Sequence, residues 1–211
     1  VAVTGWNEKR LRAAGRPYQA VHTHPASHAG YYPGAEPMSL KLLFDPGDRR
    51  ILGAQAVGGA GVDKRIDVLA TAMRAGLTAG ELADLELAYA PAFGSAKDPV
   101  NMLGYIADNL ITDAQRTVQW HELDAAVTAG ATLIDVRTEA EHAAGHIPDS
   151  LNLPLDTLRA RLDELPDGDL VVYCQVGQRG HTATVLLTGL GRRAANLDGG
   201  YRTWHAATID G

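Results

Sequence analysis

A short apolar run that leads into a glycine-rich turn constrains the fold of this chain more than any other feature. The segment VVYCQVGQRGHTA covers residues 171–183 and holds Cys174, the single cysteine of the 211-residue sequence. Leu170 to Tyr173 are apolar, β-branched or aromatic, which favours a short buried strand. From Thr182 to Leu190 the apolar spacing is helical, and Gly191 follows as a stop signal. The segment therefore predicts a strand, a turn and a helix, with the cysteine where the strand ends.

The residues between this strand and this helix predict an anion-binding loop around the thiol. They are, in order, Gln175, Val176, Gly177, Gln178, Arg179 and Gly180. The two glycines let the backbone curl so that successive N–H groups point inward at the start of a helix. Such a ring stabilises a thiolate or a persulfide over its neutral form, and Arg179 adds a positive charge. We therefore predict a catalytic Cys174, with a buried structural cysteine as the alternative.

The spacing between the thiol and the arginine separates two kinds of thiolate chemistry. Cysteine phosphatases use the pattern C-x5-R, whose loop wraps a tetrahedral phosphate, whereas Cys174 and Arg179 form C-x4-R. The smaller ring suits a sulfur atom carried on the cysteine better than a phosphoryl group. Sulfur transfer is therefore favoured, and a phosphatase stays as the disfavoured alternative.

Three motifs in the predicted domain 115–211 resemble the rhodanese family of sulfurtransferases. They are TLIDVRTEAEHAAGHIPDSLNLP (residues 132–154), the cysteine loop, and LDGGYRTWHA (residues 197–206). The resemblance implies an α/β domain with a mostly parallel sheet, in which Cys174 accepts a sulfane sulfur and passes it to a thiol. Asp135 and Arg137 follow a predicted strand, where they either support the loop or form a purely structural ion pair. The implied donor is thiosulfate, a polysulfide or coenzyme A persulfide.

Residues 1–114 predict a domain of a different class. Strand-like runs occur at 1–4, 18–23, 39–44 and 51–57, and helical patterns follow at 62–76 and 98–111. Asp98 and Pro99 are a helix cap and a first helical residue, and an apolar stripe runs from Val100 to Ile111. Strands followed by helices predict an α+β domain, in which helices cover an antiparallel sheet. The polar segment 111–118 is the predicted linker.

This first domain resembles the dimerisation domain of the pyridine nucleotide-disulfide oxidoreductases, and within them the coenzyme A disulfide reductases. The matching strings are SHAGYYPGA (residues 27–35), GVDKRIDVLA (61–70) and YAPAFGSAKDPVNMLGYIADN (89–109). The resemblance implies a homodimer in which Tyr31 and Tyr89 reach the flavin and thiol site of the partner, and in which Lys97 binds coenzyme A phosphates. The residues alone also allow packing roles for the tyrosines and simple solvation for the lysine.

Fusion to a rhodanese domain is itself an arrangement of that family, in enzymes that reduce coenzyme A persulfides or polysulfides with FAD and NAD(P)H. This chain has no G-x-G-x-x-G after a strand, so we expect neither dinucleotide to bind here. FAD, NAD(P)H and coenzyme A are implied only for a longer protein. The chain begins Val-Ala-Val-Thr without a methionine and looks like a piece of such a protein.

The amino-acid composition limits the classes of partner that this chain is expected to bind. The net charge is −6 with no basic run, which argues against nucleic acid, and no stretch approaches the roughly 20 apolar residues that span a bilayer. A single cysteine fits a reducing compartment, so we expect a cytoplasmic protein. His22, His24 and His28 suggest a metal, yet nothing nearby completes a ligand set, and we predict none.

Two functional hypotheses follow from the sequence. The first is a persulfide-forming sulfurtransferase at Cys174, cut from a coenzyme A disulfide or persulfide reductase. The second is a binding and dimerisation module with an inactive rhodanese fold, and the apolar stripe from Val100 to Ile111 motivates it.

Overall fold

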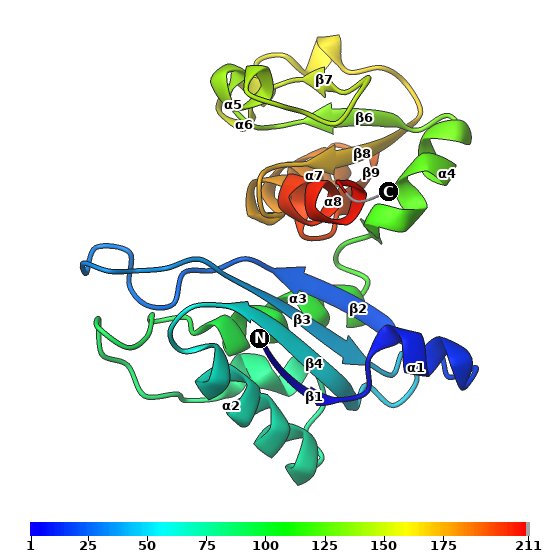
Figure 1. Cartoon of the computed structure of the whole chain (residues 1–211). Helices are drawn as coiled ribbons and strands as arrows, with labels where there is room; N and C mark the ends of the chain where they lie inside the picture. The colour runs from blue at the N-terminus through cyan, green and yellow to red at the C-terminus, as the bar shows by residue number, and fades with distance from the viewer. Residues whose placement is uncertain (210–211) are drawn as a thin grey trace. The chain divides into compact units, whose positions relative to one another are not determined.

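The computed structural model describes residues 1–209. The chain divides into two compact units, Val1–Thr112 and Asp113–Gly211, each with its own sheet (Figure 1). The predicted domain limits, 1–114 and 115–211, place the division slightly further along the chain. Both predicted fold classes are confirmed, because the first sheet is antiparallel with helices and the second is parallel. Among the described residues, no helix has both the length and the apolar character needed to cross a membrane.

The first unit is a four-stranded antiparallel sheet in the order β1-β4-β3-β2. Its elements are β1 (Ala2–Gly5), α1 (Glu8–Ala13), β2 (Gln19–Thr23), β3 (Met38–Phe44), β4 (Ile51–Gly58), α2 (Val62–Ala75), a 3₁₀-helix (Gly80–Asp84) and α3 (Pro99–Ile111). Alternate strand residues face opposite sides of such a sheet. Leu40 and Leu42 of β3 face α2 and α3, whereas Leu43 packs with Leu11 of α1 on the other side.

Helix α3 begins as the sequence predicts, and its apolar stripe lies inside the first unit. The Asp98 side chain accepts from Val100 N and forms a capping box with Asn101, and Pro99 is the first helical residue. Val100, Leu103 and Ala107 are 0 % exposed and belong to the core beneath the sheet. The stripe that motivated the assembly hypothesis is therefore an internal packing surface.

A buried ion pair joins α2 to the start of α3. Arg65 Nη2 lies 2.8 Å from Asp98 Oδ2, and both side chains are almost completely buried. The same guanidinium donates to the carbonyl oxygens of Ser27, Gly61 and Phe93. Because these carbonyls belong to different loops, Arg65 fixes the loops that follow β2 and precede α3.

The second unit is a five-stranded parallel sheet in the order β5-β9-β8-β6-β7. Its elements are β5 (Thr117–Val118), a 3₁₀-helix (Trp120–Glu122), α4 (Leu123–Thr128), β6 (Thr132–Asp135), α5 (Glu139–Ala143), β7 (Leu151–Asn152), α6 (Leu155–Leu158), a 3₁₀-helix (Leu162–Glu164), β8 (Asp169–Tyr173), α7 (Gln178–Gly189), β9 (Arg193–Leu197) and α8 (Gly200–Thr208). Strand β8 is central, with β9 and β6 as neighbours.

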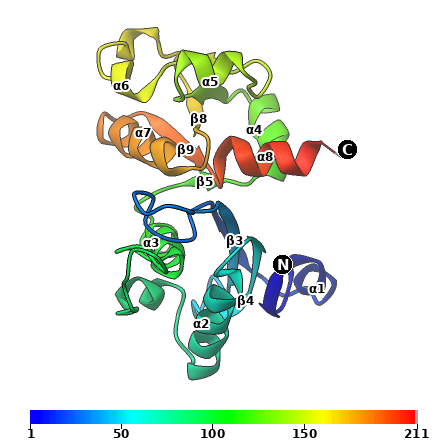
Figure 2. The ribbon, with the colours of Figure 1, turned by 60° about the vertical axis from the view of Figure 1, so that its left-hand side comes forward.

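Helices cover both faces of this second sheet, as a parallel sheet requires (Figure 2). Ile134 and Val172 face a core shared with α6 and α7. Leu133 and Val171, one residue away on the same strands, face a core shared with α4 and α8. This alternation places the end of β8 between the two layers of helices.

Two predicted boundaries in the second unit are wrong. Helix α7 begins at Gln178 and not at Thr182, because Gly177 adopts a left-handed conformation and caps it there. Its first turn carries no apolar pattern, so the sequence signal starts late. The predicted linker 111–118 is also too long, since Thr117 and Val118 form β5 and pair with β9.

Candidate functional site: the Cys174 loop

Cys174 lies directly after β8, at the carboxyl end of the central strand. The loop that follows contains Gln175, Val176 and Gly177, and Gln178, Arg179 and Gly180 form the first turn of α7. The predicted loop residues are therefore brought together, half as loop and half as helix. The cysteine itself is 0 % exposed, so the thiol lies beneath this loop and not on it.

Hydrogen bonds to the loop carbonyls determine where its N–H groups point. The Cys174 carbonyl accepts from Tyr201 N (2.8 Å), and the Gln175 carbonyl accepts from Arg202 N (3.0 Å), both in α8. In a trans peptide the N–H points away from the carbonyl of the preceding residue, and the described chain has no cis peptide. The N–H groups of Gln175 and Val176 are therefore turned away from α8.

The Gly177 carbonyl orients the first N–H group of α7 in a similar way. The Gly177 carbonyl accepts from Asn196 Nδ2 (3.1 Å) and from His181 N (2.8 Å), which turns the next N–H away from β9. Within the described chain, none of the N–H groups of residues 175–180 donates to a protein oxygen. A run of unpaired donors at a helix start is an anion-binding arrangement.

The glycines of the loop serve two different purposes. Gly177 has a φ of 94°, which only glycine adopts without strain. Gly180 is helical, and a Cβ there would meet Asn196 Oδ1, so a larger residue would require the Asn196 side chain to shift. Our prediction that both glycines curl the backbone thus holds for Gly177 and is wrong for Gly180. Neither the Asn196 contact nor its role in supporting the loop has a signal in the sequence.

Asp135 and Arg137 form a buried ion pair that reaches the cysteine loop. Arg137 Nη2 lies 2.8 Å from Asp135 Oδ2, and the two side chains are 2 % and 0 % exposed. Burial opposes ionisation of Asp135, but hydrogen bonds from Arg137 and His142 outweigh it and hold the pKa of this carboxyl below its ordinary value. Arg137 Nη1 then donates to Gln175 Oε1 (3.1 Å). The pair is therefore both structural and in contact with the site.

Arg179 does not stand free beside the thiol, because Glu141 of α5 binds it. Arg179 Nη2 lies 2.6 Å from Glu141 Oε1, and Nη1 lies 2.8 Å from Oε2. Glu141 and, to a smaller extent, the Cys174 sulfur raise the pKa of Arg179. The sequence does not predict this partner, because Glu141 and Arg179 lie 38 positions apart and Glu141 also forms a capping box with Thr138 in its own helix.

The other predicted site residues lie in the first unit. The hydroxyls of Tyr31 and Tyr89 are 2.5 Å apart, and these side chains are 75 % and 51 % exposed. Lys97 lies over the ring of Tyr105, with Nζ 4.9 Å from the ring centre. The structure thus brings the tyrosines together and leaves the lysine with a different aromatic partner.

The glycine-rich turn between β4 and α2 does not fit the pyrophosphate of a dinucleotide. The β4–α2 turn is rich in glycine and leads from a strand into a helix. The Glu36 carboxylate occupies the space beside Gly59 in this turn, where it accepts a hydrogen bond from Ala60 N (3.3 Å). A fixed negative charge there repels a phosphate. In the described part of the chain, no group of three or more His, Cys, Asp or Glu side chains could hold a metal.

Comparisons with known proteins agree with both units. Residues 1–99 match the dimerisation domain of the pyridine nucleotide-disulphide oxidoreductases, and residues 119–207 match the rhodanese-like domain. The coenzyme A disulfide reductase of Staphylococcus haemolyticus is 52 % identical over 93 residues, which are 44 % of this chain and 21 % of that protein. The chain therefore spans about a fifth of the length of this curated relative.

Two solved structures match both units together. The reduced CoADR-RHD of Bacillus anthracis has a TM-score of 0.96 and 49 % identity, over 99 % of this chain and 38 % of that one. The NAD-dependent persulfide reductase of A. fulgidus has a TM-score of 0.84 and 36 % identity, over 96 % of this chain and 36 % of that one. The chain thus carries a unit that matches the dimerisation domain of the pyridine nucleotide-disulphide oxidoreductases, followed by a unit that matches the rhodanese-like domain, and over almost its whole length it is similar to part of these two solved reductases.

Proposed function

We propose that the second unit is a sulfurtransferase in which Cys174 carries a sulfane sulfur as a persulfide. The observation that carries the proposal is the run of unpaired N–H groups over residues 175–180, which begins next to the cysteine. An apolar packing site for a cysteine has no use for such donors. A thiolate or a terminal persulfide does, because both are anions.

The chemistry balances without a metal or a redox partner. The Cys174 thiolate attacks the outer sulfur of a donor, and the electron pair of the broken sulfur–sulfur bond leaves with the rest of the donor. A thiolate acceptor then attacks the terminal sulfur of the persulfide and regenerates the Cys174 thiolate. The loop N–H groups stabilise the negative charge on the sulfur that is carried between the two steps.

Mass spectrometry of the chain after exposure to thiosulfate or polysulfide tests this proposal. We expect one added sulfur atom on Cys174 and cyanide-dependent release of thiocyanate. The Cys174→Ala variant should lose both. An alanine variant as active as the parent would contradict the assignment.

A second candidate is a binding and dimerisation module without catalysis. The complete burial of the Cys174 side chain favours it, because a donor must reach the sulfur through the loop. An unmodified Cys174 after treatment with every sulfane-sulfur donor, in a protein that light scattering shows to be dimeric, would favour this candidate.

We further propose that the full-length protein is a cytoplasmic homodimer that reduces coenzyme A disulfide, persulfide or polysulfide with FAD and NAD(P)H. The support is the shared order of domains with the coenzyme A disulfide and persulfide reductases. In that dimer, Tyr31 and Tyr89 would face the reductase site of the partner, and Lys97 would bind coenzyme A phosphates. Replacing Tyr89 in the full-length protein should lower reductase turnover without changing sulfur uptake by Cys174.

A further inference from the structure

The ion pair between Glu141 and Arg179 stands beside the reacting sulfur, yet the transfer steps above make no use of the glutamate. Its two hydrogen bonds, 2.6 and 2.8 Å long, join both Nη atoms of the arginine to both carboxylate oxygens, which is a strong arrangement for this pair of groups. The two side chains are 36 % and 34 % exposed, so solvent weakens the pair without removing it. The guanidinium is therefore held in one orientation.

The carboxylate is fixed from its other side by its own helix. Thr138 N and Thr138 Oγ1 both donate to Glu141 Oε2 at 3.0 Å, and Thr138 Oγ1 caps α5 in return. Thr138 directly follows Arg137, which is itself buried and bonded to the cysteine loop. Since Glu141 is anchored independently of Arg179, the glutamate positions the arginine and not the reverse.

The pair also sets the charge that a sulfur donor meets. Hydrogen bonds from Arg179 and Thr138 lower the pKa of Glu141 to about 2, so the carboxylate is ionised at neutral pH. The opposite charges of Glu141 and Arg179 then cancel, as do those of Asp135 and Arg137. A dianionic donor next to a thiolate would bring negative charges together with no free cation from these two pairs to balance them.

Resting on the sulfur transfer proposed above, we propose that Glu141 is a specificity-determining residue. It positions Arg179 and makes the cysteine loop prefer monoanionic sulfane-sulfur donors, such as persulfides and thiosulfonates, over the dianion thiosulfate.

Two donors of similar size isolate this charge effect. With thiosulfate, the Cys174 thiolate forms a bond to the outer sulfur, the sulfur–sulfur bond breaks, and sulfite leaves with the electron pair. With methanethiosulfonate the same bonds form and break, and methanesulfinate leaves. The two reactions differ by one negative charge on donor and leaving group, and cyanide takes the outer sulfur as thiocyanate in both.

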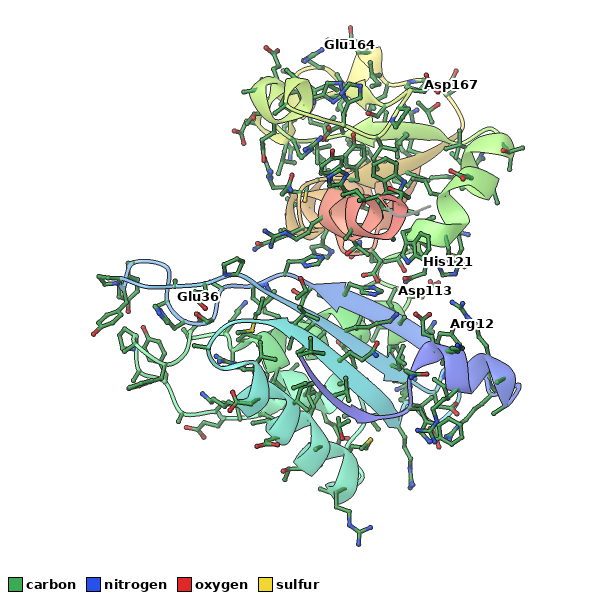
Figure 3. The ribbon with its side chains drawn as sticks, in the orientation of Figure 1. Arg12, Glu36, Asp113, His121, Glu164 and Asp167 are labelled. Carbon is green, nitrogen blue, oxygen red and sulfur yellow. The ribbon has the colours of Figure 1, made fainter. Side chains whose placement is uncertain are left out.

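The experiment measures kcat and KM for both donors in the wild-type chain and in three variants. Glu141→Gln keeps an acceptor for Thr138 but removes the charge, and Glu141→Asp keeps the charge. Glu164→Gln is the matched control, because Glu164 forms a similar two-bond pair with Arg161 on the outside of the same unit (Figure 3).

We expect Glu141→Gln to raise kcat/KM for thiosulfate about tenfold relative to methanethiosulfonate, mainly through KM. Glu141→Asp and Glu164→Gln should keep the wild-type ratio. Because the ratio is taken within one variant, a loss of folded protein lowers both rates and leaves it unchanged. An unaltered ratio in Glu141→Gln would overturn the inference and leave the proposed function standing. A wild-type chain that transfers sulfur from neither donor would overturn both.

Discussion

Each unit contains a buried arginine–aspartate pair, and the two pairs are used differently. Arg65–Asp98 in the first unit and Arg137–Asp135 in the second have the same closest distance, 2.8 Å, and both arginines are at most 2 % exposed. Among the described residues, the remaining donors of Arg65 reach backbone carbonyls of its own unit. One remaining donor of Arg137 instead reaches the side chain of Gln175 in the cysteine loop.

The difference shows that burial of an ion pair does not reveal its role. Desolvation offsets much of the attraction in any such pair, whereas removal of one partner leaves a buried charge without compensation. Both pairs should therefore be costly to break. Only the pair whose spare donor touches the loop should also affect sulfur chemistry.

Breaking the first pair should give the largest loss of stability. We expect Arg65→Ala to lower the unfolding free energy of the first unit by about 3–5 kcal/mol, because Asp98 stays buried and three carbonyls lose a donor. Hydrogen exchange resolved by segment would show the loss in residues 1–112. Sulfur loading of Cys174 should not change, and a loss of loading would contradict the distinction between the pairs.

Replacing Arg137 by lysine tests whether the charge of the Asp135–Arg137 pair is sufficient or whether the shape of the guanidinium is also needed. Arg137→Lys keeps a cation beside Asp135 but loses the planar fork that also holds Gln175 and the Gly145 carbonyl. We expect a smaller loss of stability than for an alanine variant and a drop of about tenfold in the rate of sulfur transfer, because the loop loses an anchor. Stopped-flow measurement of thiocyanate release checks the rate. An unchanged rate would make the pair purely structural.

Separation along the chain explains which of these features the sequence predicts. The Asp98 cap and the Asp135–Arg137 pair each lie within three residues, and local pattern predicts the cap and offers the pair as an alternative. Strand and helix order followed from periodicity in the same way. The other two ion pairs join residues that are far apart in the sequence, 33 positions for Arg65–Asp98 and 38 for Arg179–Glu141. Local sequence patterns therefore do not predict them. The burial of Cys174 likewise depends on how the loop packs after folding.

Acid pH should distinguish the Glu141 pair from an ordinary surface pair. The pKa of Glu141 in the folded chain, about 2, lies below its ordinary value of 4.5. Its stabilising contribution is therefore fully present above about pH 4.5 and is lost as the pH falls toward 2. In denaturant titrations over this window, Glu141→Gln should lose less stability than wild type as the pH falls. Glu164→Gln should follow the wild-type slope more closely, and equal slopes for all three proteins would contradict the ion pair.

The smallest effect is expected at the exposed tyrosine pair of the first unit. The hydrogen bond with Tyr89 raises the pKa of Tyr31, which corresponds to Tyr31 donating the proton that ionisation would remove. Tyr89→Phe should lower the pKa of Tyr31 toward its ordinary value, measured by ultraviolet absorbance in an alkaline titration, and leave the unfolding midpoint unchanged. Arg65 binds carbonyls in the segments that carry both tyrosines, so Arg65→Ala should produce the same lowering by releasing the two loops. If Tyr31 titrates at its ordinary value in the wild-type chain, the two hydroxyls are not paired, and Arg65 holds the loops without bringing their tips together.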